Sequence, residues 1–416
     1  MRAVLDWLLR RFIEKGTFRL TWPDGQVSVY SGGIGPEVAC TMRDWAAVRR
    51  FLLSPSLALG EGYMHGQITI DNGDIYDLLD LLLVNVGIET QFQPVLALQT
   101  WRIRLLRRLD QWNPVERSHR NVAHHYDLSE KLYRLFLDRD MQYSCAYFAT
   151  GQESLEEAQV AKKAHIARKL RLTGKGMRVL DIGCGWGGMA LTLARDHGAE
   201  VLGITLSREQ LEVARSRAQA AGLDGQVRFE LRDYRDVSDS FDRVVSVGMF
   251  EHVGVVQYDQ FFRTIHNCLA PDGVALLHSI GRMHGPFATD PWLTKYIFPG
   301  GYAPALSEVL PSVERSGLMA TDIEVLRLHY ALTLRHWRTR FEAHREEIKA
   351  EYDETFCRMF EFYLAGSELA FRRCGQMIWQ MQMARSIDTV PLTRDYMAKD
   401  AVSGQKMGAV FGETEI

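Results

Sequence analysis

A glycine-rich turn is the first feature of the sequence that could do chemistry. Gly183, Gly185 and Gly188 follow the GxGxxG spacing, directly after an apolar run at residues 179–182. Bare glycine backbone between a strand and a helix lets a nucleotide-like ligand approach the main chain closely. The spacing alone is a weak signal, so a tight turn that binds nothing is the competing interpretation.

Acidic residues around this turn indicate which cofactor it would hold. A dinucleotide site has an acidic residue about 20 positions further on, but the predicted strand at 200–205 ends without one. Asp181 instead precedes the glycines, and Asp233 follows the predicted strand at 227–231. This arrangement resembles that of S-adenosylmethionine-dependent methyltransferases and disfavours NAD.

The elements that position these residues alternate regularly. From residue 177 onward, strands alternate with helices, which predicts a parallel sheet with helices on its faces. Gly198 is predicted to end the helix after the glycine turn, and Ser207 to Gln210 follow a capping-box pattern that begins the next helix. The predicted strands are 178–182, 200–205, 227–231, 243–247 and 274–280, followed by a late edge strand at 377–384.

Composition limits the classes of partner. The chain has 416 residues and a formal net charge of −3, so the whole molecule offers nucleic acid no general attraction. Its apolar stretches are shorter than the ~20 residues that span a bilayer. The six cysteines are scattered without a CxxC pair, and the histidines have no metal-ligand spacing. We therefore expect no metal site and a reducing, cytoplasmic environment.

A basic amphipathic helix is predicted over residues 96–112. It carries Trp101 and Trp112 together with four arginines at positions 102, 104, 107 and 108. Such a helix is either a solvated face joined to a core stripe or a contact with an anionic membrane surface. The pattern leaves both interpretations open.

Longer motifs carry a more specific signal than the glycine turn. In chain order they are Tyr63-Met64-His65-Gly66, His125-Tyr126-Asp127-Leu128, residues 141–148, 203–207, 249–254, 277–281 and 296–301, and Tyr330 ahead of His336-Trp337. They resemble the cyclopropane-fatty-acyl-phospholipid synthases and the related mycolic acid cyclopropane synthases over essentially the whole chain. The resemblance implies an α/β fold, in which a Rossmann-like class I methyltransferase domain accompanies a smaller mixed α+β N-terminal domain. The sheet of the larger domain would be mostly parallel and seven-stranded, with an antiparallel last strand.

The resemblance also implies roles for individual residues. With Asp181 from the pattern above, the residues predicted to contact S-adenosylmethionine are Tyr143, Ser144, Gly183, Gly185, Thr205, Leu206, Gln210, Asp233 and Tyr234. Those predicted to hold a bicarbonate ion are Cys145, Glu251, His278, Tyr330 and the main chain at Ile280.

The implied reaction adds a one-carbon unit to the double bond of an acyl chain. An isolated alkene is a poor nucleophile, so its methylation needs a sulfonium donor held in line and dry. The resulting carbocation must lose a proton from the new methyl group for a ring to close, and bicarbonate is a base that escapes alkylation. The faces of Tyr330, Phe250 or Tyr147 are candidates to steady the cation. An ionised Glu251 would repel the ion, which leaves three alternatives: protonated His278, neutral Glu251, or dominant main-chain donors.

Other interpretations compete for the single residues and for the function as a whole. Taken singly, Cys145 reads as a small hydrophobe, His278 as a core histidine and Glu251 as a surface acid. The nearest rival function is methylation of the acyl double bond to give a methyl-branched unsaturated fatty acid. Less expected are an N- or O-methyltransferase of small molecules, with Glu251 and His278 as general bases, and a non-enzymatic lipid-binding protein.

The expected organisation follows from the resemblance. We expect a lipid- or membrane-associated domain at 1–95, the basic helix and linker at 96–120, and the catalytic domain at 121–416 with a substrate-binding insertion at about 282–320. The expected partner is unsaturated phospholipid in a bilayer, with no nucleic acid. A homodimer is expected, in the cytoplasm and peripherally bound to the inner face of the membrane, with residues 96–112 as the candidate contact.

Overall fold

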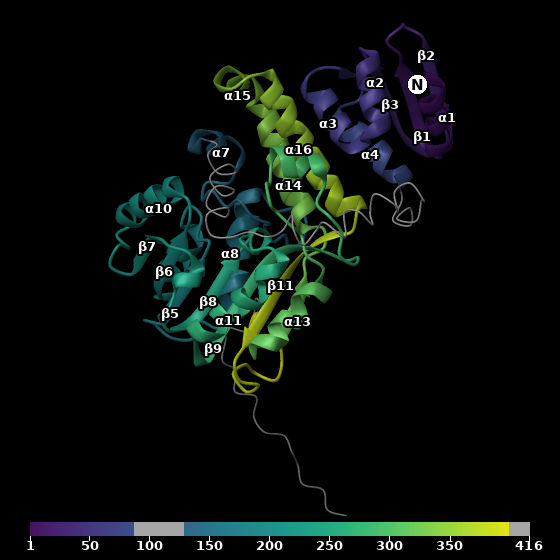
Figure 1. Cartoon of the computed structure of the whole chain (residues 1–416). Helices are drawn as coiled ribbons and strands as arrows, with labels where there is room; N and C mark the ends of the chain where they lie inside the picture. The colour runs from purple at the N-terminus through teal and green to yellow at the C-terminus, as the bar shows by residue number, and fades with distance from the viewer. Residues whose placement is uncertain (87–128, 399–416) are drawn as a thin grey trace, which may run out of the picture.

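The computed structural model describes residues 1–86 and 129–398, which form two sheets with their helices (Figure 1). In this part of the chain, the N-terminal sheet has four strands in the order β2-β1-β3-β4. The larger sheet has seven strands in the order β10-β11-β9-β8-β5-β6-β7. Figure 1 shows the N-terminal unit beside α14 (His329–Ala343) and α16 (Glu354–Arg373), which stand above the larger sheet.

Alternating burial builds the N-terminal unit. In β1 (Lys15–Thr21) and β2 (Val27–Ser31), every second side chain is buried, so Phe18, Leu20 and Tyr30 share a core with the helices. The turn at residues 22–26 joins them as an antiparallel pair, while β1 also pairs in parallel with β3. The other elements are α1 (Arg2–Phe12), β3 (Gly33–Met42), α2 (Trp45–Leu53), α3 (Pro55–Met64), β4 (Ile68–Asn72) and α4 (Ile75–Val86).

The larger sheet confirms the predicted fold class. Its strands are β5 (Arg178–Ile182), β6 (Glu200–Thr205), β7 (Val227–Leu231), β8 (Phe241–Val247), β9 (Leu269–Arg282), β10 (Met319–Val325) and β11 (Gln376–Ala384). β5, β6, β7, β8 and β9 are parallel, and β11 runs antiparallel to both of its neighbours. The long apolar runs are buried because helices cover the sheet.

One strand prediction was wrong in position. Residues 377–384 were predicted as an edge strand, but β11 lies between β9 and β10 and is almost wholly buried. β10, which the sequence pattern did not reveal, occupies the edge instead. Six of its seven side chains are exposed or half-buried, and Asp322 and Glu324 interrupt the sequence with charge, so it has no apolar run to mark it.

The covering helices begin and end largely as expected. α9 (Gly188–His197) ends at Gly198, whose φ of +66° is the left-handed conformation that glycine tolerates. Ser207 caps α10 (Arg208–Ala220) by accepting from the Gln210 N–H at 3.3 Å. The other helices beside the sheet are α8 (Leu155–Lys169), α11 (Tyr258–Cys268) and α13 (Leu306–Ser316).

An aromatic cluster joins the remaining helices above the sheet. It includes Tyr133, Phe136, Trp292, Trp337 and Phe360, all buried. The elements that carry it are α7 (Glu130–Phe136), α12 (Pro291–Tyr296), α14, α15 (Arg345–Glu351) and α16. Within the predicted insertion at 282–320, α12 joins this cluster, whereas α13 packs against α11 and leads into β10.

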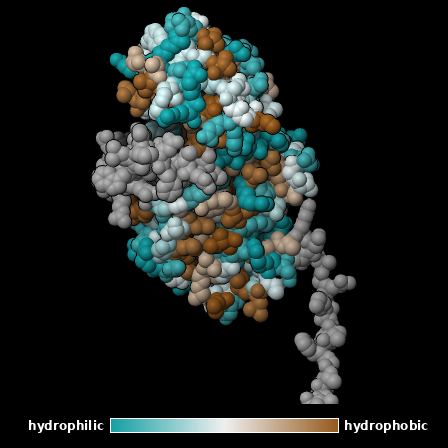
Figure 2. Space-filling view, turned by 90° about the vertical axis from the view of Figure 1, so that its right-hand side faces the viewer, coloured by the Kyte–Doolittle hydropathy of each residue, from teal (hydrophilic) through white to brown (hydrophobic). Residues whose placement is uncertain are grey.

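No helix within residues 1–86 and 129–398 is both long and apolar enough to cross a membrane. On the face shown in Figure 2, hydrophobic and hydrophilic residues are interspersed, and a group of hydrophobic residues lies on the lower half.

Candidate active site

The glycine turn adopts a backbone that other residues would strain. Gly183 and Gly185 have φ values of +79° and +52°. A Cβ on Gly183 would lie 2.7 Å from the Met249 Cβ, whereas the same atom on Gly185 would meet nothing within 4 Å. Gly183 is therefore required for packing, and Gly185 keeps the backbone bare on its open side.

A cleft opens at this turn, at the carboxyl ends of β5, β6 and β8. The strand order reverses between β5 and β8, which is the switch point where open α/β sheets bind ligands. The structure brings together there all ten residues predicted to contact the cofactor. The lining includes Tyr143, Ser144, Asp181, Gly183, Gly185, Thr205, Leu206, Gln210, Asp233 and Tyr234.

Asp181 places an unsatisfied acceptor in the cleft wall. It is 2% exposed, and among the described residues its Oδ2 has no hydrogen-bond partner. Burial raises the pKa of this carboxyl to about 7. A ligand group that donates a hydrogen bond or carries positive charge would satisfy this oxygen.

Two other cleft residues are already bonded within the protein. The Thr205 hydroxyl donates to Gln210 Oε1 at 2.9 Å, so the Gln210 side chain does not complete the predicted capping box. The Asp233 carboxylate accepts from the Arg235 guanidinium at 2.8 and 2.7 Å. Both interactions fix the cleft wall before any ligand enters.

His252, which sequence reasoning did not single out as a site residue, lines the same cleft. Burial lowers the pKa of its imidazole to about 4, so it is neutral at physiological pH. Its neighbour Glu251 belongs to the second predicted site, which brings the two sites within one residue of each other.

Three of the five residues predicted to hold the ion are connected through β9. The Ile280 N–H donates to Glu251 Oε1 at 2.6 Å. His278 lies two residues earlier, on the same face of the strand as Ile280. The side chains of Glu251 and His278 each have one buried polar atom without a hydrogen-bond partner among the described residues. These atoms are Glu251 Oε2 and His278 Nε2.

The protonation of this pair is set by burial. The pKa of Glu251 rises to about 7, and that of His278 falls well below its usual value, with desolvation the largest cause in each case. Gln380, opposite His278 on β11, brings its Nε2 within 3.1 Å of His278 Nδ1. With the amide as donor, Nδ1 accepts and His278 carries its hydrogen on Nε2. Of the three alternatives above, this geometry favours a neutral Glu251 over a protonated His278.

Cys145 and Tyr330 lie in the aromatic cluster, and Ile280 packs against it. The Cys145 thiol is 1% exposed and donates to the Ala146 carbonyl at 3.2 Å. Burial raises its pKa, so it is a thiol and no nucleophilic thiolate. The Tyr330 ring meets Trp337 edge-on at 5.7 Å. Ile280 thus links the Glu251–His278 pair on β9 to the cluster that holds Cys145 and Tyr330, and none of the five residues lines the cleft itself.

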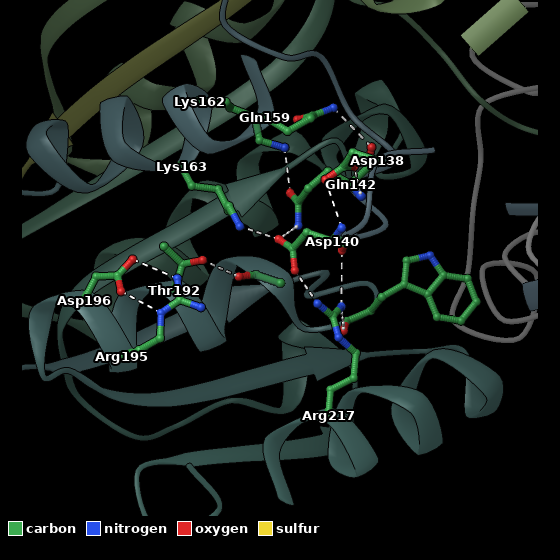
Figure 3. A network of polar contacts seen from close by, with 12 residues as sticks. Asp138, Asp140, Gln142, Gln159, Lys162, Lys163, Thr192, Arg195, Asp196 and Arg217 are labelled. Carbon is green, nitrogen blue, oxygen red and sulfur yellow. Dashed lines mark hydrogen bonds and ion pairs between the residues drawn. The ribbon is translucent and has the colours of Figure 1, made fainter. Parts of the chain in front are cut away.

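A buried polar network behind the cleft was missed by sequence reasoning (Figure 3). Gln159, Lys162 and Lys163 of α8 point toward the segment 138–144, and Arg217 of α10 reaches Asp140 from the other side. All three α8 residues are at most 5% exposed. Lysines on an amphipathic helix normally indicate a solvated face, so no signal in the sequence distinguishes these.

Comparison with known proteins places the chain beside lipid-modifying enzymes. A family model for mycolic acid cyclopropane synthetase matches residues 114–381, and a second model, for a domain of unknown function, matches residues 4–87. The cyclopropane-fatty-acyl-phospholipid synthase of Escherichia coli (strain K12) is 41% identical over 340 residues, which cover 82% of this chain and 86% of the relative.

Two further similarities extend this picture. The tuberculostearic acid methyltransferase UfaA1 of Mycobacterium tuberculosis (strain ATCC 25618 / H37Rv) is 34% identical over 397 residues, covering 92% of this chain and 91% of the relative. A solved structure, described as mycolic acid cyclopropane synthase CmaA1 complexed with SAH and CTAB, has a TM-score of 0.61 at 33% identity. It covers 66% of this chain and 99% of the solved chain.

Proposed function

Because the chain belongs to the mycolic acid cyclopropane synthetase family, we propose that it transfers a methylene unit from S-adenosylmethionine to unsaturated phospholipid acyl chains. The product would be a cyclopropane ring at the position of a cis double bond. One observation carries the proposal: a cleft lined by all ten predicted cofactor residues adjoins a buried region with unsatisfied polar atoms.

The cleft residues fit the proposed cofactor, which when bound supplies an electrophilic methyl group. Gly183 and Gly185 leave the main chain bare, and Asp181 offers an unsatisfied acceptor. Thr205, at the end of the neighbouring strand β6, is held by its hydrogen bond to Gln210 of α10. The chain's own contribution is to bind and orient the donor in a site where little water competes.

Glu251 and His278 fit a small anion such as bicarbonate, which would supply a base for the methyl proton. A neutral Glu251 donates from its hydroxyl, and a neutral His278 donates from Nε2, so neither repels the ion. The Ile280 N–H already donates to Glu251, so its predicted contact with the ion would require that bond to open.

Of the three aromatic candidates to steady a developing cation, Tyr330 is the one buried in the same core cluster as Cys145. Tyr147 stacks on both His165 and His329, at 4.4 and 5.0 Å, so imidazoles occupy its faces. Phe250 stacks on Tyr258 at 4.4 Å, in a different core cluster from Tyr330. Tyr330 meets Trp337 edge-on at 5.7 Å and Phe371 at 4.9 Å, in the same cluster as Cys145.

Methylation without ring closure is the second candidate. It is favoured by the similarity to a tuberculostearic acid methyltransferase, which covers 92% of this chain. Loss of a different proton from the same cation would give a methyl-branched alkene. The complete set of Cys145, Glu251, His278, Ile280 and Tyr330 supports ring closure.

Peripheral contact with an anionic membrane, and a homodimer, complete the proposal. The basic segment 96–112 lies outside the described residues. Within them, α1 exposes Val4, Trp7 and Leu8 at 54, 51 and 42%, and Arg11 lies over the Trp7 ring at 4.1 Å. An apolar stripe flanked by arginine suits the surface of an anionic bilayer.

The decisive experiment incubates the full chain with labelled S-adenosylmethionine and vesicles of cis-unsaturated phospholipid. The released fatty acids are then analysed by NMR. High-field cyclopropane methylene signals are the expected result. A product of equal mass that takes up hydrogen over a catalyst would identify the methyl-branched alkene instead, and no lipid product would contradict both candidates.

A further inference from the structure

Lys162 is a fully buried lysine whose hydrogen-bond partners are neutral, and desolvation lowers the pKa of its ammonium to about 8, which leaves it mostly charged at pH 7. It lies on α8 with no exposed surface. Its Nζ donates to Gln142 Oε1 at 2.6 Å and to Ser144 Oγ at 2.8 Å. In the part of the chain that the structure describes, no carboxylate lies within ion-pair distance of it. Asp138 and Asp140 favour its charge from beyond ion-pair distance. Burying an ammonium without a direct ion pair is costly, so this position calls for a compensating role.

Both hydrogen bonds of Lys162 go to one short segment, residues 141–145, which contributes residues to both predicted sites. Ser144 lines the cofactor cleft, and Cys145 follows it in the predicted ion site. The segment begins at Met141, whose φ of +56° is a strained conformation for a residue with a side chain. Gln159, from the same face of α8, donates to the Ser144 carbonyl at 3.0 Å. Helix α8 therefore holds Gln142 and Ser144 of this segment by both backbone and side chain. Figure 3 shows the contacts with Gln142.

An ammonium sets the direction of the hydrogen bonds around it. Lys162 has only donors, so Ser144 Oγ must accept from it and the hydroxyl hydrogen of Ser144 is left to donate elsewhere. The same logic orients Gln142, whose Oε1 accepts from Lys162 while its Nε2 donates to Asp140 at 3.0 Å. An apolar side chain at position 162 would leave the direction of the Ser144 hydroxyl undetermined, whereas Asp140 would still orient the Gln142 amide.

We propose that Lys162 is a positioning residue of the transfer reaction, which turns the Ser144 hydroxyl toward an acceptor group of the cofactor and holds Cys145 in register with it. This inference rests on the proposed function, since it assumes that the cleft binds S-adenosylmethionine. It adds a residue that neither the cleft lining nor the predicted ion site contains.

Lys163 offers a matched control on the same helix. It is also buried, at 5%, but its ammonium bonds to Asp140, which Arg217 holds from the other side. Lys163→Met therefore removes a buried ammonium from the network without touching Ser144. We compare it with Lys162→Met in the full chain.

The first readout is the affinity for S-adenosylhomocysteine, measured by calorimetry. Loss of a charge-assisted hydrogen bond corresponds to roughly a tenfold weaker affinity. We expect Lys162→Met to show this loss and Lys163→Met to stay within about twofold. We also expect Lys162→Met to raise the KM for S-adenosylmethionine more than it lowers kcat. If Lys162→Met does not fold, Lys162→Gln, which keeps an amide donor, should show a smaller loss of the same kind.

A double-mutant cycle that combines Lys162→Met with Ser144→Ala tests whether Lys162 affects cofactor binding through Ser144. If Lys162 acts through Ser144, the double variant should bind no more weakly than the weaker single variant. Additive losses, or wild-type affinity in Lys162→Met, would overturn the inference. Failure of the wild-type chain to bind S-adenosylhomocysteine would instead overturn the proposed function, so the two failures are distinguishable.

Discussion

Glu251 and Asp181 are buried carboxyls, each with one oxygen that finds no partner among the described residues. Burial raises the pKa of both to about 7. Each of them therefore lowers the stability of the free protein at neutral pH. Buried carboxyls of this kind persist where a ligand uses them, and these two lie at the two predicted ligand sites.

The stability cost of Glu251 should be visible as a pH dependence. Its pKa is raised from 4.5, so the folded state binds the proton more tightly than the unfolded state does. Stability is then greatest below about pH 4.5 and is lost as the pH rises to about 7. Glu251→Gln keeps an acceptor for the Ile280 N–H and removes this loss. Its free energy of unfolding at pH 8 should therefore be about 2 to 3 kcal/mol higher than that of the wild-type chain.

Chemical denaturation of both proteins between pH 5.5 and 8.5 measures this difference. It should grow with pH up to about 7 and then level off. A constant difference across this range would show that Glu251 does not titrate there. The same variant should form no lipid product.

His278→Ala separates chemistry from cofactor binding. The imidazole lies outside the cofactor cleft but offers an unsatisfied Nε2 to the predicted ion site. We expect S-adenosylhomocysteine affinity within about twofold of wild type and product formation lower by roughly a hundredfold or more. Full activity of this variant would exclude His278 from the ion site, and lost affinity would assign it to the cleft.

Side chains whose role depends on their burial could not be predicted. Lys162 and Gln380 belong to residue types that are normally exposed, and only the packing of α8 and β11 shows that both are fully buried. Asp181 and the glycines could be predicted from the sequence because they adjoin a recognisable strand end. Residue types and spacing thus revealed the cleft but not what supports it.

At the scale of elements, the strands with continuous apolar runs were predicted to within a few residues. β5, β6 and β7 have the predicted bounds because parallel, fully buried strands contrast sharply with the glycine and capping residues around them. β10 was missed and β11 was misplaced, because an edge strand shows no such contrast and strand order is a property of the assembled sheet. The basic segment 96–112 lies outside the described residues, so its prediction stands as stated.

The glycine turn should tolerate no side chain at Gly183. Gly183→Ala would combine a left-handed φ of +79° with a Cβ 2.7 Å from Met249. We expect a loss of about 2 to 4 kcal/mol in unfolding free energy and no detectable binding of S-adenosylhomocysteine. Gly225→Ala is the control, because a Cβ there meets nothing within 4 Å and should change stability by less than about 1 kcal/mol. Equal stability of the two variants would contradict this account of the turn.

The basic segment 96–112 should determine membrane binding. Reversal of its four arginines at 102, 104, 107 and 108 to glutamate should abolish sedimentation with anionic vesicles and leave S-adenosylhomocysteine affinity intact. Reversal of Arg195 and Arg228, which are 61 and 71% exposed, is the control and should leave sedimentation unchanged. If the variant with the four reversed arginines still sediments with the vesicles, residues 96–112 do not determine membrane binding.

At the scale of the whole molecule, the N-terminal unit is joined to the catalytic part through α16. Tyr63, within one of the motifs that carried the resemblance, donates to Glu361 at 2.8 Å, and the Trp292 indole donates to Met64 Sδ at 3.2 Å. Ala365 and Leu369 of α16 are fully buried in the core of the N-terminal unit. The motif at 63–66 thus serves the contact between the two parts.

This shared core predicts that the two parts unfold together and can be uncoupled. Ala365→Glu would bury an unpaired carboxyl between them, at a cost of several kcal/mol. We expect one calorimetric unfolding transition in the wild-type chain and two in the variant, with S-adenosylhomocysteine affinity unchanged because the cofactor cleft lies on the larger sheet. Arg373→Ala, at the rim of the same contact, removes a part-exposed pair with Asp80 and should cost less than about 1 kcal/mol. A single transition in Ala365→Glu, at the wild-type temperature, would mean that α16 does not couple the two parts.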